Sequence, residues 1–168
     1  MAQLKLREFQ EYLANRLNSA ARGEISSALL GVQSGAHHWL LKLDDGGEIL
    51  PMPPLSPVPL THTWFAGMAN IRGNLYSVID FAAFRGEEPT PRTSHARLVL
   101  LGARFGINSA ILVHRMLGLR PADSFTGTDE PGDHPWVSEM LTDAEGRRWR
   151  RLDVPALLAD PTFKQIGL

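Results

Sequence analysis

The 168-residue chain contains no cysteine. This absence excludes a disulfide framework, a thiolate zinc site, an iron–sulfur cluster and a cysteine nucleophile. No charge sign dominates either, because 17 Lys and Arg residues balance 18 Asp and Glu residues. Such a balance argues against a protein whose main task is to hold nucleic acid or to coat an anionic membrane. No apolar run approaches the roughly 18–20 residues that cross a bilayer, and no signal peptide is evident, so we expect a cytoplasmic protein.

The common sequence signatures of enzymes are also missing. The chain has no glycine-rich phosphate loop, no His-Glu-x-x-His motif and no Gly-x-Ser-x-Gly motif. Its six histidines show no ligand spacing with carboxylates, and the adjacent His37 and His38 would point to opposite faces of a strand. We therefore predict no metal, no cofactor and no catalytic activity. Spacing alone does not exclude a Ser-His-Asp triad, because such triads assemble in space.

Near the start of the chain, apolar residues recur at spacings of three and four. This spacing places them on one face of a helix over about residues 3–22, ending near Gly23. The face consists of Leu6, Phe9, Leu13, Leu17 and Ala20. Such an amphipathic helix needs a surface to pack against. It either covers an open edge of its own domain or docks on a partner.

From residue 27 onward the pattern changes to short apolar runs separated by glycine, asparagine, aspartate and proline. Runs at roughly ten-residue spacing with turn residues between them indicate an all-β sandwich or barrel. The predicted strands are 27–33, 38–43, 48–52, 74–81, 97–105 and 109–119. Alternate residues of 75–81 are apolar on both sides, so we expect this strand to be covered on both faces.

Four further segments lie between or after these strands. Residues 51–59 hold five of the twelve prolines and are a stiff connector or, alternatively, a polyproline ligand. Residues 85–94 are polar and divide the β-rich region near its middle. The basic residues 147–151 are interpreted as a solvated edge strand, with nucleic-acid stacking as the alternative. Asp153, with proline in the following turn, predicts an N-capped short helix over 153–160.

The most informative segment is 64–81. A polar, glycine-containing interruption at 70–74 separates an apolar turn from a strong strand. Gly67 and Gly73 allow a positive φ or a close backbone approach. Arg72 stands at the entrance to the strand, where its guanidinium can offer several donors to a carboxylate or to exposed carbonyls. The plainer interpretation is a turn before a core strand, with Arg72 merely solvated.

This segment reads Trp-x-x-Gly-x-x-Asn-x-Arg-Gly, followed by a strand that ends in aspartate. It resembles the signature of the CheW-type chemotaxis coupling proteins, and the resemblance extends over about residues 27–158. The helical extension and the ending at 152–163 are similar to the CheW-like adaptors of type IV pilus (twitching motility) systems. The chain departs from the family at 44–47, which is acidic and glycine-rich, and at His114, where members usually carry aspartate.

The resemblance implies two five-stranded SH3-like β-barrels within a CheW-like domain of residues 27–163. The first barrel would cover about 27–85 and the second about 94–152, with the short helix at 153–160 after them. Residues 1–26 would form an N-terminal helical extension. The two halves exchange elements in this family, so these limits are approximate.

The function that the resemblance implies is non-catalytic coupling of receptors to a kinase. One surface would bind the cytoplasmic tip of a methyl-accepting chemoreceptor, and another would bind the regulatory domain of a CheA-type histidine kinase. Neither nucleic-acid binding nor direct membrane insertion is expected. The candidate partner-binding residues are Glu48, Ile49, Gly67, Asn70, Arg72 and Gly73, and Trp64 and Asp80 are assigned to structural support.

Two other classes of protein stay open at this point. A generic SH3-like module would bind another protein or nucleic acid without a kinase partner. A small β-barrel enzyme would need a closed pocket that contains a perturbed titrating group.

Overall fold

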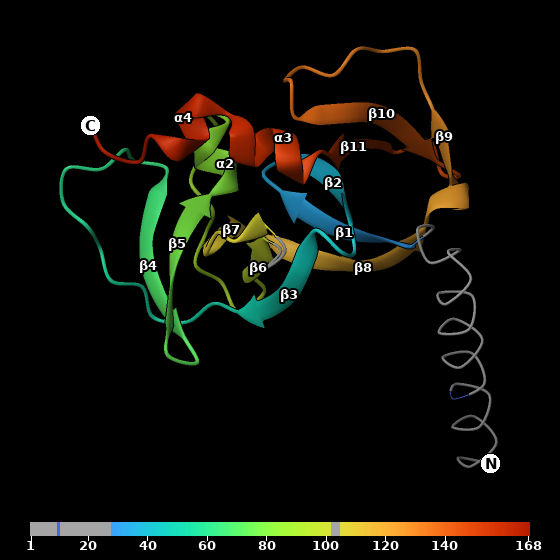
Figure 1. The fold of residues 1–168 in the computed structure, drawn as a ribbon. Coiled ribbons are helices and arrows are strands. Elements are labelled where there is room, and N and C mark those ends of the chain that lie inside the picture. The colour runs from blue at the N-terminus through green and yellow to red at the C-terminus, as the bar shows by residue number, and fades with distance from the viewer. Residues whose placement is uncertain (1–9, 11–27, 102–104) are drawn as a thin grey trace.

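The computed structural model describes residue 10, residues 28–101 and residues 105–168 (Figure 1). The predicted helix at 3–22 and the extension 1–26 lie outside these residues except for Gln10, whose backbone is helical. The strands are β1 (Ala28–Ser34), β2 (His37–Lys42), β3 (Gly46–Pro51), β4 (Phe65–Ile71), β5 (Asn74–Asp80), β6 (Arg97–Leu101), β7 (Ser109–Val113), β8 (Arg115–Pro121), β9 (Phe125–Gly127), β10 (Val137–Asp143) and β11 (Arg148–Leu152). The helices are α2 (Phe81–Phe84), the short 3-10 helix η3 (Ala122–Ser124), α3 (Val154–Ala159) and α4 (Pro161–Lys164). No helix in the described part of the chain is long and apolar enough to span a membrane.

The described strands form two sheets (Figure 1). One has six strands in the order β8-β1-β2-β11-β10-β9, and the other has five in the order β3-β6-β7-β5-β4. Neighbouring strands are antiparallel, except for the parallel pairs β2–β11 and β5–β7. In chain order, the whole five-stranded sheet is inserted between β2 and β8 of the six-stranded sheet. Each sheet therefore combines strands from both of the predicted barrel ranges.

Each of the six predicted strands overlaps an observed strand. The predicted run 109–119 is divided at His114 into β7 and β8, because the chain passes there from one sheet to the other. Strands β4, β9 and β10 fall outside the predicted set, since small or charged residues interrupt their apolar alternation. The prediction of an edge strand at 147–151 is wrong: β11 lies between β2 and β10, and Trp149 is fully buried.

Three hydrophobic clusters explain why so many strands are apolar on both faces. Along β6, Leu98 belongs to a cluster inside the five-stranded barrel, whereas Val99 belongs to a cluster between the two sheets. We call the second cluster the shared core, because it takes side chains from both sheets and from α2, α3 and α4. A third cluster surrounds Trp149 in the six-stranded barrel. Strand β5 is covered on both faces as predicted, because Val78 lies in the cluster inside the five-stranded barrel and Ile79 lies in the shared core.

Two local predictions outside the strands are confirmed. The proline-rich segment 51–59 is a connector from β3 to β4, and Ser56 exchanges two backbone hydrogen bonds of 2.8 Å with Met68 on β4. The predicted C-terminal helix is α3, whose first turn is capped by the Asp153 carboxylate accepting from the Ala156 N–H at 3.1 Å. A second short helix, α4, follows directly and was not expected from the sequence.

Candidate functional site

The Asn-x-Arg-Gly motif forms the tip of the β4–β5 hairpin. Ile71 pairs with Asn74, which leaves Arg72 and Gly73 as a two-residue turn. Their φ angles are 52° and 84°, and positive φ at both central residues is typical of a type I′ hairpin turn. Asn70 supports the turn, because its Oδ1 accepts a hydrogen bond from the Gly73 N–H at 3.0 Å. The apolar turn expected before the motif is instead strand β4, and the polar interruption is confined to the hairpin tip.

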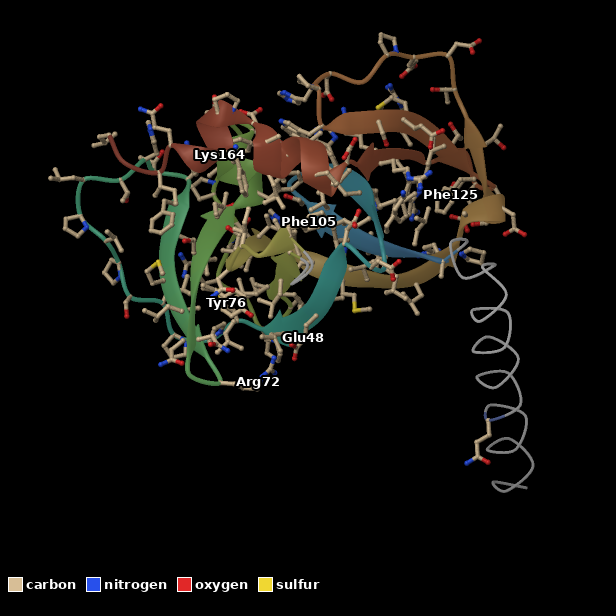
Figure 2. The ribbon with its side chains drawn as sticks, in the orientation of Figure 1. Glu48, Arg72, Tyr76, Phe105, Phe125 and Lys164 are labelled. Carbon is tan, nitrogen blue, oxygen red and sulfur yellow. The ribbon has the colours of Figure 1, made fainter. Side chains whose placement is uncertain are left out.

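Arg72 pairs with Glu48 at the end of the five-stranded barrel (Figure 2). Its Nη1 and Nη2 donate to the two carboxylate oxygens at 2.7 Å and 2.5 Å. Glu48 lies on β3 and Arg72 directly follows β4, and these two strands are the opposite edges of the five-stranded sheet. The ion pair therefore joins two edges that approach each other when the sheet curls into a barrel.

The pair is exposed to solvent and carries both charges at neutral pH. The exposed fraction of the side chain is 66% for Arg72 and 37% for Glu48. The hydrogen bonds from Arg72 lower the pKa of Glu48 from its ordinary value of 4.5, and the same bonds raise the pKa of Arg72. A guanidinium has five N–H donors, and two of them point at Glu48. Three donors are thus left for a carboxylate or carbonyl of a partner.

Two side chains follow the turn on β5, and they point to opposite faces of the strand. Leu75, the second residue of β5, is 59% exposed. Tyr76 is half-buried and lies close enough to contribute to the raised pKa of Arg72 (Figure 2). Sequence reasoning misses both, because nearly every position of this strand is apolar and alternation does not separate its faces. The available signal is their place directly after the motif.

Two of the predicted contact residues make contacts within the fold. Ile49 is half-buried, pairs with Val99 on β6 and packs against the shared core. Gly67 is buried with a φ of 133°, and an added Cβ would lie 2.7 Å from the carbonyl oxygen of Ser56. The close approach that Gly67 allows is therefore made by the chain's own proline-rich segment. Around Gly73, by contrast, an added Cβ would meet nothing within 4 Å.

Trp64 and Asp80 lie at the end of the hairpin opposite Arg72. The Asp80 N–H donates to the Trp64 carbonyl at 2.8 Å. The buried Asp80 carboxylate caps α2 through the Ala83 N–H at 3.3 Å. It also accepts from the Thr90 N–H at 2.8 Å and the Thr90 hydroxyl at 2.7 Å. All of these contacts are internal, so we keep both residues as structural support.

The basic residues of β11 are paired within the chain. Their acidic partners lie on β10 and on the segment between β9 and β10. The pairs are Arg148–Glu130, Arg150–Asp133 at 3.5 Å and Arg151–Glu139 at 3.1 Å. This pairing leaves little unpaired positive charge on β11 to attract phosphates, which argues against a nucleic-acid site there. In residues 28–101 and 105–168, no group of three His, Asp or Glu side chains gathers as a metal site.

Residues 28–162 match the family model of the CheW-like domain. The chain belongs to the CheW-like domain family. Among solved structures, the CheW-like chain is similar to the scaffolding protein TtCheW from Thermoanaerobacter tengcongensis, with a TM-score of 0.69 and 15% sequence identity. The match covers 83% of this chain and 92% of that chain. The predicted fold of two SH3-like barrels is thereby confirmed, although the short strand β9 gives one sheet six strands instead of five.

This CheW-like chain is also similar to Protein PilI of Pseudomonas aeruginosa, with 28% identity over 99 residues. The matched part is 58% of this chain and 55% of the relative, so it spans about half the length of that protein. The similarity agrees with the predicted resemblance to the pilus-type members of the family.

Proposed function

We propose that this chain is a non-catalytic adaptor that holds a methyl-accepting chemoreceptor and a CheA-type histidine kinase together in a type IV pilus chemosensory pathway. It would act in the cytoplasm, at the receptor arrays. Membership of the CheW-like family and the similarity to Protein PilI support this class of function. The observation that carries the proposal is the exposed Glu48–Arg72 pair at the hairpin tip.

The hairpin tip has the chemistry that such recognition needs. The guanidinium of Arg72 keeps three N–H donors for a carboxylate or for the carbonyls at the end of a receptor helix. Leu75, three residues later in the same hairpin, supplies an exposed apolar side chain. Because the ion pair and the Asn70 side chain already fix the turn, less side-chain freedom is lost when a partner binds. A receptor conformation that makes better contacts here would be favoured, and the kinase would respond to that bias.

The test is a binding assay that uses the full chain and two purified pieces from the same genome, the receptor tip and the kinase regulatory domain. We expect Arg72→Ala to weaken binding of one of them about ten- to a hundredfold. Arg148→Ala is the matched control, because Arg148 is also exposed and paired with a glutamate, but lies on the other sheet. It should change the affinity by less than about twofold, because Arg148 lies on the other sheet, away from the hairpin tip.

The same assay separates the other interpretations. If Arg72→Ala lowers the melting temperature as strongly as it lowers the affinity, Arg72 is a structural residue. If both arginine variants weaken binding equally, the contact is unspecific charge attraction. If the folded chain binds neither piece, the adaptor proposal is wrong and a generic SH3-like module is left.

A further inference from the structure

Three exposed apolar side chains lie on or beside the six-stranded sheet, two of them on its outermost strand β8 and one just after β2. They are Leu43, Met116 and Leu119, with exposed fractions of 38%, 41% and 54%. We call these three residues the β8 patch. Strand β8 is the outermost strand of its sheet, and an open strand of seven residues is a site where proteins usually place a covering helix or charged residues.

The register shows that the β8 patch continues the shared core. Leu119 pairs with Leu30, and Met116 pairs with Val32. Paired residues of antiparallel strands point to the same face, and both β1 residues are fully buried in the shared core. Leu43 follows β2 by one residue and alternates with Leu41 of the same core. The patch is therefore the rim of the shared core that no described element covers.

The chain enters the fold at this rim. Ala28, the first residue of β1, pairs with Pro121, only two residues from Leu119 (Figure 1). Residues 23–27 would link the predicted helix at 3–22 to this point. Five extended residues span at most about 17 Å, so the C-terminal end of the predicted helix would lie near this rim.

The spacing of apolar residues in the predicted helix matches the spacing on β8. From Leu13 to Ala20 the rise along a helix is about 10 Å. From Met116 to Leu119 the rise along a strand is also about 10 Å. If the helix runs antiparallel to β1, Leu13 lies over Met116 and the last apolar turn lies over Leu119.

We propose that residues 3–22 form a helix that docks within the same chain on the β8 patch. The five-residue link gives the segment an effective concentration in the millimolar range, which a separate partner would have to exceed. The docked helix buries the apolar rim of the shared core and covers the open edge of β8. This proposal is independent of the adaptor function, because it involves neither the hairpin tip nor a receptor or kinase.

The absence of native cysteine allows a direct test with pairs of introduced cysteines in the full chain. The test pair is Leu13→Cys with Met116→Cys, and the matched control pair is Asn15→Cys with Met116→Cys. Asn15 lies on the opposite side of the predicted helix, about 200° from Leu13. Under mild oxidation we expect the test pair to form an intramolecular disulfide at least about tenfold faster than the control pair.

Three results would overturn the proposal. Equal rates for the two pairs would mean that the segment has no docked face. Disulfides that form only between chains would mean that a second copy occupies the patch. No disulfide with either pair would mean that the segment lies elsewhere.

Hydrogen exchange on the chain with native side chains provides a second measurement. Amides of residues 9–20 should be protected, and Leu119→Asp should increase their exchange about tenfold or more. Leu168→Asp is the control, because Leu168 is 80% exposed and lies away from β8, where its N–H donates a hydrogen bond to the Leu60 carbonyl. Equal exchange in the native chain and the Leu119→Asp variant contradicts the docking.

Discussion

Replacing Gly67 by alanine tests how the proline-rich segment is held against the hairpin. The added Cβ would lie 2.7 Å from the Ser56 carbonyl oxygen, and the φ of 133° is one that alanine rarely adopts. Backbone strain of this kind costs about 1–3 kcal/mol. If Ser56 moves away instead, its two backbone hydrogen bonds with Met68 weaken, at about 1 kcal/mol each. Either response lowers the free energy of unfolding by about 2 kcal/mol, which is the middle of the first range and the sum of the two weakened hydrogen bonds.

Gly73→Ala is the matched control, because it changes the same residue type in the same hairpin. Its φ is 84°, but an added Cβ meets nothing within 4 Å. The substitution therefore costs only the strain of the positive φ, about 1 kcal/mol. For a domain of this size, 1 kcal/mol corresponds to about 2–4 °C in melting temperature. We therefore expect a loss of about 4–8 °C for Gly67→Ala and about 2–4 °C for Gly73→Ala.

The assay is thermal and urea unfolding followed by tryptophan fluorescence, which Trp64 and the other three tryptophans make possible. Equal losses for the two variants would refute the argument, because they would show that contact with Ser56 contributes nothing. A Gly67→Ala variant that keeps its stability but loses partner affinity would instead place Gly67 at the binding surface.

Three further outcomes are expected. Asp80→Ala should lower the free energy of unfolding by about 2–4 kcal/mol in urea titrations, because the buried carboxylate accepts three hydrogen bonds; Thr90→Val, which removes one of them, should cost about 1 kcal/mol. Burial lowers the pKa of His114, whose Nδ1 accepts from the Gly35 N–H at 2.9 Å. The His114 imidazole therefore binds a proton more readily in the unfolded chain than in the folded one. Its contribution to stability is complete above pH 6.5, the ordinary pKa of histidine, and is lost as the pH falls below that value. His114→Gln should therefore make the melting temperature less dependent on pH between pH 5 and 7. Finally, circular dichroism and fluorescence should report one coincident unfolding transition, since the two sheets share a core; two separate transitions would contradict this.

Much of the fold could be predicted because short apolar runs and breakers are local signals. The strands that escaped prediction show the limit of such signals. In β4, Gly67 and two alanines replace the large apolar residues that mark a strand, and the strand is defined by pairing with β5. The position of β11 in its sheet depends on parallel pairing with β2, more than 100 residues earlier in the chain, and on burial of Trp149. No nearby residue encodes either contact.

The sequence suggested individual candidate residues for the site, but it did not predict how they are arranged. Glu48 and Arg72 were each candidates for partner contact, yet their mutual ion pair depends on the curl of a whole sheet. Gly67 illustrates the opposite case, because its signal for close approach is correct while the approaching group is the chain's own Ser56. A motif thus indicates which residues need an unusual backbone angle, a close contact or a charged partner. Only the fold shows which group makes that contact.

The way the chain connects its two sheets bears on how such an adaptor can work. The five-stranded sheet begins after β2 and ends before β8, so the chain crosses between the sheets twice within the described residues. The shared core takes Leu30 and Trp39 from one sheet and Val99 and Ile111 from the other. Separating the barrels would expose this close-packed core, so we expect them to move as one body. The binding surfaces would then keep fixed positions relative to one another on a rigid frame. A partner would bind the exposed pair at the hairpin tip without any hinge motion inside the adaptor.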